Sequence, residues 1–105
     1  MDFTMTRVVT LTSEEMNETQ QAVWEEIRSG PRGVSPHGPF MAWLQSPTLA
    51  DRAQKLGEYL RFNAQMDKRL AELAILTVAR HWTAQFEWFA HKNFALEAGL
   101  ARDII

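Results

Sequence analysis

The stretch MDKRLAELAILTVARHW, residues 66–82, carries the strongest helical pattern in the chain. Its apolar residues recur at steps of three and four and cover almost the whole circumference, which is typical of a buried helix. Asp67, or the residue before it, can cap the start of this helix. No long run alternates with a period of two, so we expect no sheet. The pattern predicts an all-α fold with a helix over 69–81 at its centre.

Two further helices are predicted before this one. Thr12 and Glu15 have the spacing of a capping box, which predicts a helix that begins after Thr12 and stops at Gly30. Ser46, followed by a proline at the first helical position, predicts a second helix, on which Leu49, Leu56 and Leu60 keep a helical period. Gly57 interrupts that helix, at a cost of about 1 kcal/mol unless another group packs close to it.

A last helix is predicted over 84–98. Thr83 is expected to cap its start, and Gly99 followed by Leu100 has the pattern of a helix end. This helix is expected to run antiparallel to the helix over 69–81 and to pack against it.

The length of 105 residues fits one small domain over 1–105, with residues 1–11 as a loose arm. The net charge of −2 and the absence of a basic run favour neither nucleic acid nor a membrane surface as a partner. No apolar run reaches the roughly 18 residues that span a bilayer, and the N-terminus lacks the apolar core of a signal peptide. We therefore expect a cytoplasmic protein.

Aromatic residues are abundant for this length, with four tryptophans and six phenylalanines. A small monomer cannot easily bury so much apolar surface. We therefore expect a homo-oligomer in which Trp82, Trp88 or Phe89 lies partly buried between chains.

Ionisable residues gather in HWTAQFEWFAH, residues 81–91. Glu87 and His91 are four residues apart on one helix face, where a carboxylate can fix the tautomer of an imidazole and leave its other nitrogen free for proton transfer. Such a pair is more often an ordinary surface contact. Glu72 lies in the most apolar helix, and a structural ion pair there is as probable as a catalytic role. We expect the His91 ring within about 6 Å of these carboxylates, the reach of a charge interaction.

A metal site would have to use His81, Glu87 and His91, whose spacing differs from that of helical zinc motifs. We expect neither a metal nor another cofactor. His37 stands in a loop rich in glycine and proline, and such a histidine usually faces solvent.

Residues 69–100, RLAELAILTVARHWTAQFEWFAHKNFALEAGL, resemble the carboxymuconolactone decarboxylase family, which includes the alkylhydroperoxidase D-like proteins. Residues 38–62, GPFMAWLQSPTLADRAQKLGEYLRF, resemble an upstream segment of the same family. The resemblance implies an alkylhydroperoxidase D-like helical bundle, a trimer or hexamer, and sites near subunit contacts. It also implies further chain after residue 105, so we expect a C-terminally truncated member.

The peroxidase branch of that family has a glutamate followed by a cysteine, a histidine, a second cysteine and a second histidine. By this resemblance Glu72 matches the glutamate and His91 the last histidine, whereas Ala84, Phe86 and Glu87 replace the other three. The chain contains no cysteine, and a thiolate is the nucleophile of that reaction. Thiol peroxidase activity is therefore not expected.

The resemblance implies instead a proton-transfer lyase or isomerase that acts on a small carboxylated ring or lactone. His91 would move a proton to or from carbon. Glu87 and Glu72 would orient the His91 ring or shuttle protons. The candidates for substrate binding are Arg80, Arg61, His81 and His37, of which either arginine could hold a carboxylate. The alternative is a non-catalytic helical oligomerising module that kept the fold and lost the site.

Overall fold

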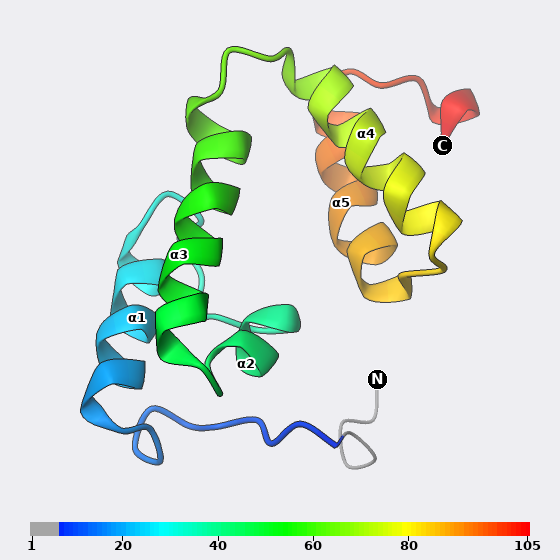
Figure 1. Cartoon of the computed structure of the whole chain (residues 1–105). Coiled ribbons are helices and arrows are strands. Elements are labelled where there is room, and N and C mark those ends of the chain that lie inside the picture. The colour runs from blue at the N-terminus through cyan, green and yellow to red at the C-terminus, as the bar shows by residue number, and fades with distance from the viewer. Residues whose placement is uncertain (1–6) are drawn as a thin grey trace. The chain divides into compact units, whose positions relative to one another are not determined.

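The computed structural model describes residues 7–105, which fall into two compact units that divide between Phe62 and Asn63 (Figure 1). All regular structure in residues 7–105 is helical, so the expected all-α class is confirmed. None of the helices there is long and apolar enough to cross a membrane. The alkylhydroperoxidase D-like bundle and the single domain over 1–105 stay predictions.

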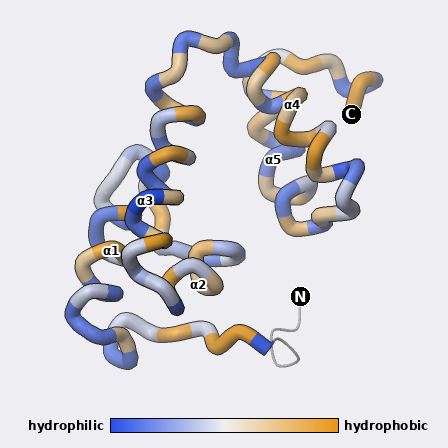
Figure 2. The backbone as a smooth tube through the Cα atoms, in the orientation of Figure 1, coloured by the Kyte–Doolittle hydropathy of each residue, from blue (hydrophilic) through white to orange (hydrophobic). Residues whose placement is uncertain are grey.

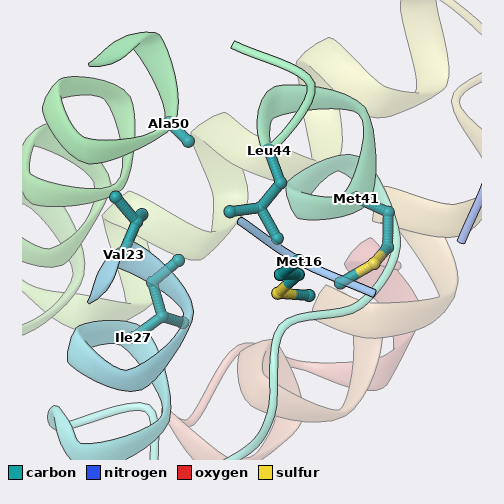
Figure 3. Packing of buried hydrophobic residues seen from close by; sticks show 6 residues of the cluster. All are labelled: Met16, Val23, Ile27, Met41, Leu44 and Ala50. Atoms are coloured by element: carbon teal, nitrogen blue, oxygen red, sulfur yellow. The ribbon is translucent and has the colours of Figure 1, made fainter. Parts of the chain in front are cut away.

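The first unit contains α1 (Glu18–Ser29), α2 (Pro39–Trp43) and α3 (Pro47–Glu58), followed by one π-helical turn, Tyr59–Asn63. Both α1 and α2 contact α3. Figure 3 shows the side chains that meet between these elements, namely Met16, Val23, Ile27, Met41, Leu44 and Ala50. Leu11 packs against this cluster, so the described end of the expected loose arm has no helix but does contact the core. Residues 1–6 of that arm lie outside the described residues.

The predicted start of α1 after Thr12 is wrong. Thr12 and Glu15 instead form a turn, in which the backbone N–H of Thr12 donates to Glu15 Oε2 at 2.9 Å. The helix begins five residues later, because Asn17 and Gln20 form a complete capping box with reciprocal bonds of 2.8 and 2.9 Å. The predicted end of α1 at Gly30 is confirmed.

The apolar period on α3 lies on the exposed face of the first unit. Leu49, Leu56 and Leu60 are exposed, whereas Ala50 and Gln54 face the core. Gly57 does have a close neighbour, since a Cβ atom built there would lie 2.9 Å from Nη2 of Arg32. The absent side chain therefore makes room for the arginine.

The second unit is a helical hairpin of α4 (Lys68–His81) and α5 (Gln85–Glu97), followed by a short 3-10 turn, Arg102–Ile104. The two helices lie side by side and run in opposite directions (Figure 1), as expected. Asp67 caps α4, accepting a hydrogen bond of 2.8 Å from the N–H of Arg69. The core of the hairpin consists of Leu76, Ala95 and Leu100, with Leu73, Trp88 and Ile105 against them.

Helix α4 is less enclosed than its sequence predicts. Hydrophobic residues recur along it (Figure 2), but Leu70 and Val78 remain exposed. Only the face with Glu72, Leu76 and Ala79 is buried, because α5 and the C-terminal segment cover one side of the helix.

Thr83 does not cap α5, contrary to expectation. Its φ angle is 52°, in the left-handed region, and it forms the turn that ends α4. The N–H of Thr83 donates to Arg80 O and the N–H of Ala84 to Ala79 O, which is the Schellman pattern. The same pattern ends α5, where Gly99 has a φ angle of 97° and Leu100 is buried, as predicted.

Candidate functional site

Glu72 and His91 meet across the hairpin. Nδ1 of the His91 ring lies 2.7 Å from Oε2 of Glu72, at hydrogen-bond distance. The two side chains are only 10% and 12% exposed, for Glu72 and His91 respectively. An ionised carboxylate can only accept hydrogen bonds, so Nδ1–H of the imidazole is the donor in this contact. Glu72 thereby determines which ring nitrogen carries the proton when the ring is neutral.

Glu87 stands on the other side of the ring. Its Oε2 atom lies 3.6 Å from Nε2 of His91, beyond ordinary hydrogen-bond distance. The Glu87 side chain is 39% exposed, so it is much more accessible than Glu72. The ring of Phe94 approaches the imidazole edge-on, with 5.6 Å between ring centroids. The imidazole thus has one tight and one loose carboxylate neighbour.

The hairpin itself brings these groups together. Glu72 lies in the second turn of α4, and His91 lies about two turns into the antiparallel helix α5. Glu87 precedes His91 by one turn on the same face. Both carboxylates lie within the predicted distance of about 6 Å from the ring, which confirms the expected convergence of the three side chains.

Two of the four expected substrate-binding residues belong to the second unit but lie elsewhere on the hairpin. Arg80 stands eight residues after Glu72, about 12 Å along the helix axis at 1.5 Å per residue. It lines a hollow at the turn, and His91 is not among the residues around that hollow. His81 is exposed and packs edge-on against Trp82. Neither residue joins the Glu72–His91–Glu87 cluster.

The other two expected residues belong to the first unit. The guanidinium of Arg61 lies 4.8 Å from the ring centre of Phe62. His37 is exposed, and its Nδ1 atom lies 3.0 Å from the backbone oxygen of Ser35. Each residue is therefore engaged locally within the first unit.

A metal site over His81, Glu87 and His91 does not form. In residues 7–105, no three or more histidine and carboxylate side chains are grouped so that they could hold a metal ion. The hairpin turns His81 towards Trp82, at the opposite end from Glu72. The Glu72–His91–Glu87 cluster therefore offers acid–base groups, and His81 is not part of it.

A polar contact that the sequence did not indicate lies in the first unit. Arg32 donates hydrogen bonds to the backbone oxygen of Gln54 at 3.2 Å and to its Oε1 atom at 3.4 Å, and its guanidinium lies over the ring of Phe40. Partial burial, and then the nearby charge of Arg61, lower the pKa of Arg32 from its usual range. Gln54 is fully buried. This contact fastens the loop after α1 to α3.

No family model, no curated protein and no solved structure matches this chain.

Proposed function

We propose that the chain is a proton-transfer protein of the carboxymuconolactone decarboxylase type, a lyase or isomerase acting on a small carboxylated ring or lactone. The observation that carries the proposal is the position of His91 between two carboxylates, one 2.7 Å and one 3.6 Å away. A histidine oriented by a carboxylate is a common general base, and its second nitrogen performs the transfer.

The roles of the three side chains follow from their exposure. Glu72 is nearly buried and accepts Nδ1–H, so it orients the ring and stabilises the imidazolium that forms. Nε2 of His91 takes a proton from a carbon next to a carbonyl group and returns it to the same or a neighbouring carbon. Glu87 is accessible and not tightly bonded, so it can swing aside when substrate enters, and it can exchange the proton on Nε2 with one from water before a proton returns to carbon.

Hydrogen–deuterium exchange at carbon tests this proposal without knowledge of the exact substrate. The full chain is incubated in D2O with a panel of small carboxylated lactones and cyclic keto acids, and exchange at carbon is followed by NMR. We expect enzyme-dependent exchange with at least one compound and a loss of at least about 100-fold in His91→Gln, the usual contribution of a general base. The control is His81→Gln, which removes an exposed histidine outside the cluster.

The result that would contradict the proposal is exchange at the buffer rate with every compound, or equal rates in the wild type and His91→Gln. Equal losses in His91→Gln and His81→Gln would also contradict it, because they would show no special role for the cluster.

A second candidate function is the non-catalytic helical oligomerising module. It is supported by exposed aromatic side chains on the hairpin, since Trp82 is 74% and Phe89 72% exposed. The trimer or hexamer expected from the family resemblance would cover these rings. An inert chain that forms a stable oligomer would favour the module over the enzyme.

A further inference from the structure

The hollow at the turn between α4 and α5 is the part of the hairpin that the proposed proton transfer does not use. It has a volume of about 380 Å³ and is lined by Ala79, Arg80, Thr83, Ala84, Gln85 and Trp88. Sites for small molecules usually have volumes of about 300–1,000 Å³, mostly apolar walls and a few polar groups. The hollow has both properties.

Among the described residues that line the hollow, Arg80 is the only one with an ionisable side chain. Within residues 7–105, no carboxylate forms an ion pair with it. A guanidinium presents a planar set of N–H donors that matches the two oxygens of a carboxylate. The hollow therefore has, at a position where a ligand can reach it, a guanidinium that no described carboxylate pairs with.

Trp88 supplies the apolar wall of the hollow. It is half-buried against the hairpin core, which holds its ring in place, and Ala79 and Ala84 leave space beside it. Flat aromatic groups bind well against such a ring because they bury area and stack. The lining thus combines one cationic group with one aromatic surface.

Thr83 adds a second reason to expect a ligand here. A β-branched residue rarely adopts a φ angle of 52°, and glycine would adopt it at least cost. The chain nevertheless has threonine at this turn, and this residue lines the hollow. Backbone strain of this kind is common in binding sites.

A second hollow of about 270 Å³ shares Arg80 and Trp88 with the first. Its other lining residues are mainly apolar: Leu73, Leu76, Thr77, Leu100, Ile104 and Ile105. Because the two hollows share the same arginine and tryptophan, the apolar body of a ligand has room to extend beyond one ring.

We propose that this hollow is a binding site for a small aromatic carboxylate. The carboxylate binds the Arg80 guanidinium with both oxygens, and the ring packs on Trp88. The site is separate from the Glu72–His91–Glu87 cluster, since Arg80 lies about 12 Å along α4 from Glu72. A test of this binding site therefore does not decide the proton-transfer proposal.

Benzoate and benzamide are the matched probes, because they have nearly the same shape and only benzoate is charged. Binding to the full chain is measured by NMR, from shifts of the Trp88 indole resonance, and by calorimetry. For so small a ligand we expect a dissociation constant for benzoate on the order of 1 mM. Benzamide should bind at least about tenfold more weakly, because it lacks the charge-assisted contact.

Two arginine variants make the test specific. Arg80→Gln, at an exposed position, should weaken benzoate binding at least about tenfold. Arg69→Gln is the control, because Arg69 is an exposed arginine of the same helix whose nearest carboxylate is Asp67 at 3.9 Å, away from the hollow. It should bind benzoate as the wild type does.

The proposal is overturned if benzoate and benzamide bind equally, or if Arg80→Gln binds benzoate as tightly as the wild type. It is also overturned if the Trp88 indole resonance does not shift at a benzoate concentration 50 times the expected dissociation constant. Loss of benzoate binding in Arg69→Gln would also overturn it, since it would show that the effect is not specific to Arg80.

Discussion

Thr83 is the residue whose conformation differs most from what its side chain favours. Among residues 7–105 it is the one non-glycine residue with a positive φ angle. Gly99 occupies the equivalent position at the end of α5, where nothing lies within 4 Å of a Cβ atom built on it. The chain therefore contains the same turn twice, once with a strained residue and once with an unstrained one.

Replacing Thr83 with glycine should raise the free energy of unfolding by about 1 kcal/mol, because relief of the left-handed strain exceeds the added backbone entropy of glycine. Gly99→Ala, the matched opposite change, should lower it by about the same amount. Both values are measured by urea denaturation. A Thr83→Gly variant less stable than the wild type would contradict the account of this turn.

Gly57 offers a second test at the residue scale. A Cβ atom there would lie 2.9 Å from Arg32 Nη2, whose guanidinium is bonded to Gln54. In the wild type, Gly57→Ala should gain helix propensity but displace Arg32, so the two effects offset each other. In an Arg32→Ala background the same change should stabilise α3 by about 1 kcal/mol, because no arginine is displaced. A double-mutant cycle by urea denaturation measures this coupling, and strictly additive effects would contradict the close contact.

At the scale of elements, the hairpin determines the site. Helix ends that depend on local chemistry, such as Asp67, Pro47 and Gly99, were predictable from the sequence. The start of α1 was not, because two segments five residues apart both have capping-box spacing and the reciprocal pair of bonds forms only at the second. The Glu72–His91 contact was predictable because a tight turn between two helices leaves little freedom in how they align. Arg80 was a candidate for carboxylate binding from the sequence alone, but the hollow was not predictable, since it depends on how the turn places Ala79, Ala84 and Trp88 around it.

The two carboxylates beside His91 should contribute unequally to the stability of the hairpin. Glu72→Ala should lower the free energy of unfolding by about 1–3 kcal/mol, because it leaves the buried imidazole N–H without an acceptor. Glu87→Ala should change it by less than about 0.5 kcal/mol, as expected for an exposed and loosely paired carboxylate. Chemical denaturation of both variants checks the difference, and equal effects would refute the distinct roles of the two residues.

At the scale of the whole molecule, exposed apolar surface is the dominant feature. Leucines along α3 and aromatic rings on the hairpin face outward within their own units. Such surface is unusual for a small monomer. The sequence predicted this excess through its aromatic content, although it did not indicate which side chains would be left uncovered.

We expect the chain to form a homo-oligomer at micromolar concentration. A Trp82→Ser, Phe89→Ser double variant should shift it towards the monomer, because the variant lacks the exposed rings whose apolar area association would bury. Multi-angle light scattering gives both masses. Thr19→Ser, a change at an exposed position of α1, serves as the control. A wild-type chain that remains monomeric would contradict the expectation.

The claim that Glu72 fixes His91 for proton transfer through Nε2 is tested most directly by the proton position on the ring. Long-range ¹H–¹⁵N correlation NMR, recorded at a pH where the ring is neutral, distinguishes the two tautomers. The account predicts that the His91 proton resides on Nδ1, facing Glu72 at 2.7 Å, and that this preference disappears in Glu72→Ala. The exposed ring of His81 serves as the internal reference. A His91 proton on Nε2, unchanged by Glu72→Ala, would contradict the account, because the nitrogen assigned to proton transfer would then be blocked.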